Sequence, residues 1–177
     1  MDNLAFKYKT DKGTRSVNGT SGKGYTLLYE KYFKIYKYAP IRILEIGVKS
    51  GASLRMWSEY FPNAEIIGID INPATKCEVG TIYIGDQTDT DFLKKVIDGY
   101  EGYFDIIIDD GGHKFEQIRT SFETLIDCVG ICYVVEDLHV SGKKFFNYLS
   151  DMFDLIQHGN CRIKSVHIYK SIAFIWM

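Results

Sequence analysis

Short apolar runs alternate with longer amphipathic segments along most of the chain. Runs of strand length occupy residues 41–47, 64–71, 80–86, 104–110 and 130–137. Segments whose hydrophobic residues recur at helical spacing occupy residues 25–38, 52–61, 89–100, 114–129 and 142–157. In the first of these helices, the expected apolar face consists of Leu28, Tyr32, Ile35 and Tyr36. Short apolar strands separated by helices are typical of a parallel sheet covered on both faces, so the pattern predicts a doubly wound α/β fold.

The two ends of the chain depart from this alternation. Residues 162–177 predict two strands joined by a tight connection near Lys170 and Ser171. Strands so closely joined indicate that the last strand inserts antiparallel beside its neighbour. The result is a Rossmann-like mixed sheet of seven strands. Residues 1–24 are rich in Lys, Gly, Ser and Thr, and we expect a flexible N-terminal segment or lid there. We expect residues 25–177 to form a single domain, because 177 residues are too few for two domains that each bury a sizeable hydrophobic core.

The charge balance narrows the range of partners. The 21 basic residues nearly balance the 23 acidic ones, so no overall electrostatic field favours binding to nucleic acid or to an anionic membrane. We therefore expect a small-molecule or saccharide acceptor and leave a homo-oligomer open. The chain shows neither a signal peptide nor an apolar stretch of membrane-spanning length, which predicts a cytoplasmic protein. Its four cysteines form no CxxC pair and are expected to be reduced thiols.

The turn after the first predicted strand, LEIGVKSGAS, has features of a cofactor site. Ligands of open α/β sheets bind at the carboxyl ends of the strands. Glu45, Gly47 and Gly51 stand at this end, where small residues allow close approach and a helix N-terminus offers unpaired N–H groups. Lys49 stands where a G-x-G-x-x-G pattern would have its second glycine, which disfavours a nicotinamide dinucleotide. A bare structural turn is the alternative.

The next two strand ends add acidic and amide side chains. Asp70 follows the turn by about twenty residues, where a carboxylate can accept hydrogen bonds from ribose hydroxyls. Asp86 and Gln87 could face an adenine, or they could cap the following helix. An adenosine site without phosphate-binding chemistry fits S-adenosylmethionine better than NAD.

Carboxylates and a histidine follow the fourth and fifth predicted strands, in DDGGH and VVEDLH. If the two strands are neighbours, Asp110, Glu136 and Asp137 meet at one cleft, and a divalent cation such as Mg²⁺ would neutralise them. His113 could then act as the general base toward a hydroxyl polarised by the metal. His139 is the weaker candidate. Helix caps exposed to solvent are the alternative for the acidic residues.

These motifs, together with TDKGT and YTLLYEKYF, resemble the metal-dependent sugar O-methyltransferases of macrolide biosynthesis and, more distantly, cephalosporin hydroxylase-like proteins. The resemblance implies a class I S-adenosylmethionine-dependent methyltransferase. It implies that the metal ligands are Asp110, Glu136 and Asp137, that His113 is the general base, and that the cofactor is held by Glu45, Gly47 and Asp70. It also implies that Asp109 lies close to the methionine end of the cofactor.

Two positions depart from the pattern of these relatives. A glycine usually stands where this chain has Lys49, and a histidine often stands in the place of Lys23 and Gly24. The N-terminal segment is expected to close over the cofactor, with contacts from Tyr8, Lys12, Thr14 and Tyr25. Its basic residues could also favour an acceptor that carries phosphate.

The sequence therefore predicts methyl transfer to a vicinal diol on the sugar of a glycoside, surface polysaccharide or natural product. Two substrate oxygens and one water would fill the metal positions that the side chains leave open. A catechol offers the same pair of oxygens and is the alternative acceptor. An NAD(P)-dependent oxidoreductase and a non-catalytic binding protein are further alternatives from other functional classes.

Overall fold

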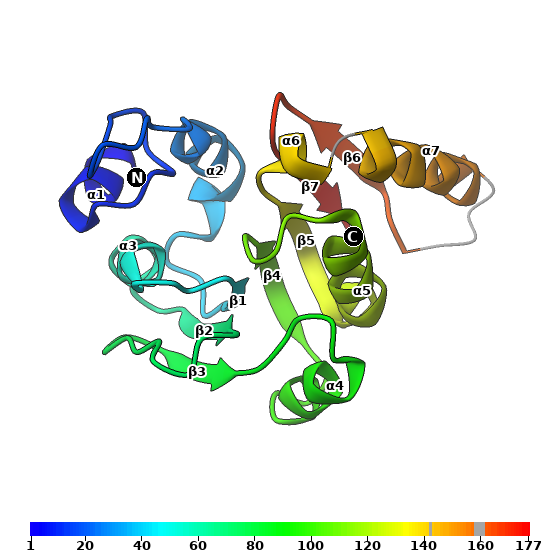
Figure 1. Cartoon of the computed structure of the whole chain (residues 1–177), viewed down its shortest axis with the longest axis horizontal. Coiled ribbons are helices and arrows are strands. Elements are labelled where there is room, and N and C mark those ends of the chain that lie inside the picture. The colour runs from blue at the N-terminus through cyan, green and yellow to red at the C-terminus, as the bar shows by residue number, and fades with distance from the viewer. Residues whose placement is uncertain (142, 158–161) are drawn as a thin grey trace.

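A single mixed sheet of seven strands forms the centre of the molecule. The structure is a computed structural model that describes residues 1–141, 143–157 and 162–177 (Figure 1). The strands run in the order β3-β2-β1-β4-β5-β7-β6. Strands β1 to β5 are parallel, whereas β7 is antiparallel to both β5 and β6. The predicted seven-stranded sheet with an antiparallel last strand is thus confirmed. The strands are β1 (Arg42–Ile46), β2 (Glu65–Asp70), β3 (Thr81–Ile84), β4 (Phe104–Asp109), β5 (Val129–Val135), β6 (Ser165–Ile168) and β7 (Ala173–Trp176).

Helices cover both faces of the sheet, because the central strands are apolar on both sides. One apolar cluster joins Leu44 and Ile46 of β1 to residues of α4, α5 and α7. The other joins Ile43 of β1 to residues of α1, α2 and α3 on the opposite face (Figure 1). The helices are α1 (Asp2–Tyr8), α2 (Tyr25–Phe33), α3 (Ala52–Tyr60), α4 (Thr90–Asp98), α5 (Phe115–Leu125), α6 (Leu138–Ser141) and α7 (Lys143–Gln157), with 3₁₀ turns η1 (Lys34–Tyr36) and η2 (Ile126–Cys128).

Helix α2 buries residues outside the expected apolar face, although Leu28, Tyr32 and Tyr36 of that face are partly buried against the same core. Its buried side chains include Tyr25, Tyr29 and Phe33, whereas Ile35, just beyond the helix, is 73% exposed. The aromatic bodies of the tyrosines pack in the core while their hydroxyl groups reach buried carboxylates. Polar partners elsewhere in the chain therefore set the rotation of this helix.

The N-terminal segment contains a helix that the sequence pattern did not indicate. Helix α1 packs against α3 and buries Ala5 completely. Residues 9–24 are irregular apart from a bridge between Val17 and Thr20. The role of this segment as a lid stays a prediction.

Two expectations fall outside the described residues, namely the first residue of the helix expected at 142–157 and one of the four cysteines, Cys161. Within the described ranges, Cys77, Cys128 and Cys132 are free thiols. No helix in those ranges is long and apolar enough to cross a membrane.

The turn after β1 touches the loop after β4, which places the two strand ends together. The Asp110 N–H donates to the carbonyl of Ile46 at 2.9 Å, and the Gly47 N–H donates to that of Ile69 at 2.8 Å. Gly47 has φ of +92°, and a Cβ there would lie 2.1 Å from the carbonyl oxygen of Asp110. Only glycine therefore fits under the Asp110 loop.

We expect Gly47→Ala to destabilise the protein by more than the roughly 1 kcal/mol that a positive φ alone costs an alanine, because the methyl group also meets backbone. Gly102→Ala is the matched control, since Gly102 has φ of +75° with no atom within 4 Å of an added Cβ. Urea denaturation of both variants measures the difference. Equal losses would show that the close approach to Asp110 is not a constraint.

Candidate active site

A cavity of about 580 Å³ lies at the carboxyl ends of the parallel strands. The turn after β1, the ends of β2 and β3 and the loops after β4 and β5 form its floor. Residues of the N-terminal segment, from Lys9 to Lys23, form part of its wall. The cavity lies where ligands of open α/β sheets bind, and where strands β1 and β4 leave in opposite directions along the sheet.

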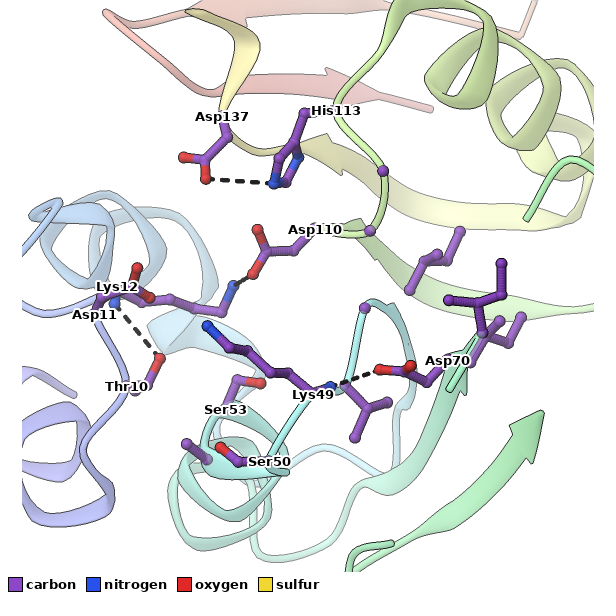
Figure 2. Close-up of a pocket in the computed structure, with 18 of the residues that line it drawn as sticks. Thr10, Asp11, Lys12, Lys49, Ser50, Ser53, Asp70, Asp110, His113 and Asp137 are labelled. Carbon is purple, nitrogen blue, oxygen red and sulfur yellow. Dashed lines mark hydrogen bonds and ion pairs between the residues drawn. The ribbon is translucent and has the colours of Figure 1, made fainter. Parts of the chain in front are cut away.

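Three potential metal ligands converge on one side of this cavity. Asp110 follows β4, His113 lies three residues further on, and Asp137 follows β5. Each offers a ligand atom within 4.8 Å of the others, and the His113 Nε2 is 3.6 Å from an Asp137 oxygen (Figure 2). Two carboxylates and an imidazole that line a cavity suit a divalent cation such as Mg²⁺, which prefers oxygen and keeps open positions.

Asp137 is held by two groups from the N-terminal part of the chain. Its carboxylate accepts hydrogen bonds from Lys23 Nζ at 2.6 Å and from the Tyr25 hydroxyl at 2.8 Å. Burial raises the pKa of Asp137, but the bonds from Lys23 and Tyr25 and the charge of Lys23 outweigh it, so the pKa lies below its usual value. Asp137 is therefore negatively charged at neutral pH and faces His113.

Lys12 is a fully buried ammonium surrounded by carboxylates. Its Nζ lies 2.6 Å from Asp110, 2.8 Å from Glu136 and 3.3 Å from Glu45. Burial lowers the pKa of Lys12, but the three negative charges outweigh burial and hold the pKa well above its usual value. This one cation thus links the N-terminal segment to the ends of β1, β4 and β5, and Figure 2 shows its contact with Asp110.

Glu136 is fully buried and is not among the three potential ligands whose atoms lie within 4.8 Å of one another. One of its oxygens accepts a hydrogen bond from the Tyr29 hydroxyl at 2.5 Å and also contacts Lys12. Its other oxygen is buried without a hydrogen-bond partner. Burial and the charge of Asp110 outweigh the effects of Lys12 and Tyr29, so the pKa of Glu136 lies above its usual value. Its assignment as a metal ligand stays a prediction. The unpartnered oxygen is free to coordinate a metal ion.

Asp70 lies at the end of β2 on the opposite side of the cavity from Asp137. Its two oxygens accept hydrogen bonds from the backbone N–H groups of Lys49, at 2.6 Å, and Asn72, at 2.8 Å. A carboxylate has about four acceptor sites, so Asp70 keeps capacity for two neighbouring hydroxyl groups. These two backbone hydrogen bonds thus fix the orientation of the Asp70 carboxylate at the cavity wall.

Asp109, the first aspartate of DDGGH, is buried beneath the cavity and does not line it. It accepts hydrogen bonds from Ser121 at 2.5 Å, Tyr133 at 3.1 Å and Gln87 at 3.2 Å. Burial raises its pKa to about 6. Gln87 in turn accepts from the Gly112 N–H at 2.5 Å. Asp109 therefore supports the DGG turn that presents Asp110 and His113.

The predicted site residues fall into two groups. Those that line the cavity are Gly47, Asp70, Asp86, Gln87, Asp110, His113 and Asp137. Those that lie behind or beside its wall are Thr14, Tyr25, Glu45, Gly51, Asp109 and Glu136. Glu45 is fully buried and accepts a hydrogen bond from Trp57 at 3.0 Å, and the Thr14 hydroxyl donates to Asp2 at 2.8 Å. The roles of all these residues in cofactor binding stay predictions.

The sequence interpretation missed the central part that Lys12 and Tyr29 play. Lys12 was expected only as a contact of a mobile segment, and its carboxylate partner Asp110 is 98 residues away in sequence. Tyr25 and Tyr29 stand four residues apart on α2, and both bond to the acidic pair after β5. Two tyrosines four residues apart lie on the same face of a helix, and this spacing could have indicated a pair of buried hydroxyl groups.

Comparison with known proteins identifies relatives of the chain, although no protein-family model matches it. It is 33% identical to mycinamicin VI 2''-O-methyltransferase of Micromonospora griseorubida over 85% of the chain and 47% of that enzyme. It is also 39% identical to a Streptomyces olivaceus tetracenomycin rhamnosyl 3'-O-methyltransferase, over 64% of the chain and 32% of that enzyme. The chain thus spans about half the length of the mycinamicin enzyme, and less of the other.

A solved structure supports the same relationship. The MycE methyltransferase of mycinamycin biosynthesis, in complex with Mg, SAH and mycinamycin VI, superimposes with a TM-score of 0.82 at 32% identity. The match covers 98% of this chain and 53% of that one. The described fold is therefore that of the class I S-adenosylmethionine-dependent methyltransferases.

We expect Lys12→Met to destabilise the protein by about 3–5 kcal/mol, because it leaves buried carboxylates without their cation. Lys23→Met is the matched control. Lys23 also contacts two carboxylates, but its side chain is 23% exposed, so its loss should cost much less. Urea denaturation in the presence of a chelator measures both. A similarly small decrease in the free energy of unfolding for both variants would contradict a central role for Lys12.

Proposed function

This chain is a homologue of the sugar O-methyltransferases that act on macrolide and tetracenomycin glycosides, and we propose that it is an S-adenosylmethionine-dependent, Mg²⁺-dependent O-methyltransferase acting on a sugar hydroxyl. The observation that carries the proposal is the convergence of Asp110, His113 and Asp137 beside a cavity that also contains Asp70. The carboxylates suit a divalent cation and Asp70 suits a ribose.

When bound, S-adenosylmethionine supplies the methyl group, and a divalent cation polarises the accepting hydroxyl. Asp110 and Asp137 would hold the cation, with Glu136 as the third carboxylate that the sequence predicts. Glu136 can contribute the buried oxygen that has no hydrogen-bond partner. The donor set therefore fits a hard cation, and its charge would offset the repulsion between the carboxylates.

In this proposal His113 removes the proton from the accepting hydroxyl. Its side chain is 26% exposed on the cavity wall, and its Nε2 lies 3.6 Å from Asp137. The negative charge of Asp137 stabilises the imidazolium that forms when His113 takes the proton. Asp109, through Ser121 and Gln87, keeps the turn that carries His113 in place. Positioning by the chain thus aligns the hydroxyl with the methyl donor.

The names of the relatives favour a sugar over a catechol as the acceptor. The acceptor is proposed to be a saccharide hydroxyl with a neighbouring oxygen, on a glycoside, surface polysaccharide or natural product. A cytoplasmic location and the absence of a nucleic-acid partner belong to the same proposal. A homo-oligomer stays open.

The proposal is tested by thermal unfolding with S-adenosylhomocysteine or NAD, each with and without Mg²⁺. A ligand that binds only the folded state raises the midpoint, so S-adenosylhomocysteine should raise it and NAD should not. Methyl transfer to a panel of glycosides, with catechols alongside, then identifies the acceptor class. Stabilisation by NAD alone would overturn the assignment.

We expect His113→Ala to reduce methyl transfer about 10²- to 10⁴-fold while thermal shifts with S-adenosylhomocysteine and Mg²⁺ persist, because only the proton acceptor is lost. His139→Ala is the matched control, since His139 is exposed on α6 two residues beyond Asp137 and does not line the cavity. Single-turnover transfer assays of both variants provide the measurement. Unchanged turnover in His113→Ala would rule out the base assignment.

A further inference from the structure

An open groove of about 660 Å³ lies on the surface between helices α5 and α7, apart from the cavity at the strand ends. Its residues come from one face of each helix, at the spacing of three or four positions that brings side chains together. They include Phe115, Arg119 and Glu123 of α5, and Lys144, Tyr148 and Asp151 of α7. The chemistry proposed above uses none of these side chains.

Two aromatic rings are the most buried part of this groove. Phe115 and Tyr148 are half-buried, and their ring centroids lie 5.9 Å apart with the rings inclined at 73°. The Tyr148 hydroxyl donates to Glu123 at 3.0 Å, and the same Glu123 oxygen accepts from Arg119 Nε at 2.9 Å. These bonds hold the Tyr148 ring in one orientation, so a ligand does not have to order it.

Polar side chains of both signs surround the two rings. The lining includes two cationic and two anionic side chains, so it carries no net charge. Within residues 1–141, 143–157 and 162–177, the side chains of Lys144, Asn147 and Asp151 form no hydrogen bond or ion pair. These three groups are available to a ligand, and the balance of charge gives no preference to an ionic one.

Aromatic rings beside available donors and acceptors are suited to a saccharide. The C–H face of a sugar ring packs on an aromatic ring, while its hydroxyl groups both donate and accept hydrogen bonds. An apolar helix or peptide in the same place would bury the charged groups without partners, which costs free energy. The lining therefore fits a neutral, polyhydroxylated ligand best.

The groove begins beside the candidate active site. Phe115 lies two positions beyond His113, and Gln117, in the same turn of α5, lines the main cavity. From Phe115 to Glu123 the helix rises about 12 Å, which is longer than a single sugar ring. Sugars attached to the one that reacts beside His113 can therefore extend along the groove.

We propose that the groove between α5 and α7 binds the sugar units next to the one that is methylated, so that the acceptor is an oligosaccharide chain. The inference rests on the proposed function and narrows its substrate class. Among the proposed acceptors, it favours a polysaccharide over a glycoside that carries a single sugar.

The test compares matched monosaccharides and trisaccharides of rhamnose, glucose, galactose and mannose. Calorimetric titration, with S-adenosylhomocysteine and Mg²⁺ present, measures each affinity. At least one trisaccharide should bind about tenfold more tightly than its monosaccharide, the size of one or two added hydrogen bonds. Equal affinities in every pair, or binding of no trisaccharide, would overturn the inference.

A double variant, Lys144→Ala with Asp151→Ala, should lose the preference for the trisaccharide, because it removes two polar groups of the groove. The matched control is Lys143→Ala with Ser150→Ala, since both residues are exposed on α7 one position earlier and do not line the groove. All four are exposed helix positions, where alanine favours the helix. The control should keep the preference, and an equal loss in both double variants would overturn the inference.

Three further outcomes identify which proposal fails. Dimerisation in light scattering that the groove variant abolishes would identify a second copy of the chain as the occupant and overturn the inference. Binding of S-adenosylhomocysteine without any length preference would overturn the inference alone. Failure of S-adenosylhomocysteine to bind, with the length preference intact, would overturn the proposed function and the role of the saccharide as an acceptor.

Discussion

The buried ammonium of Lys12 is the interaction on which the arrangement of the site depends. Carboxylates at the carboxyl ends of three different strands surround Lys12, because the parallel sheet brings these strand ends together at one edge. Such a cluster repels itself in a medium of low dielectric constant, and one cation at hydrogen-bond distance offsets that repulsion. The same contact fixes the N-terminal segment to the sheet. Lys12 therefore both holds the wall of the cavity in place and balances the charge of the carboxylates.

The centre of the sheet was predictable from the sequence because β1, β2, β4 and β5 are short, largely apolar runs, as strands covered on both faces require. The antiparallel β7 followed from two runs joined too closely for a crossover. The face of α2 was not predictable from hydrophobicity, because Tyr25 and Tyr29 are buried through hydroxyl bonds to Asp137 and Glu136. Helix α1 depends on its packing against α3, which no local pattern records.

The site was predictable in position but only partly in orientation. Strand ends in a parallel sheet meet at one edge, so Asp110 and Asp137 could be placed together before any coordinates. In each pair the first acid is the more buried one and bonds to groups inside the protein. Asp109 bonds to Ser121, and Glu136 bonds to Tyr29 and Lys12. The ion pairs of Lys12 and Lys23 join residues about a hundred positions apart, beyond the reach of any sequence spacing.

The position of β7 between β5 and β6 has a consequence for the order of folding. Strand β6 pairs only with β7 in the described sheet, so it cannot join before a strand that comes later in the chain. The hairpin of β6 and β7 must therefore dock on β5 as a unit or add β7 first. Docking also brings Ser171 against the Leu138 N–H and the Tyr25 hydroxyl, next to Asp137. The acidic edge of the sheet thus depends on a long-range contact, the kind of closure that slows folding.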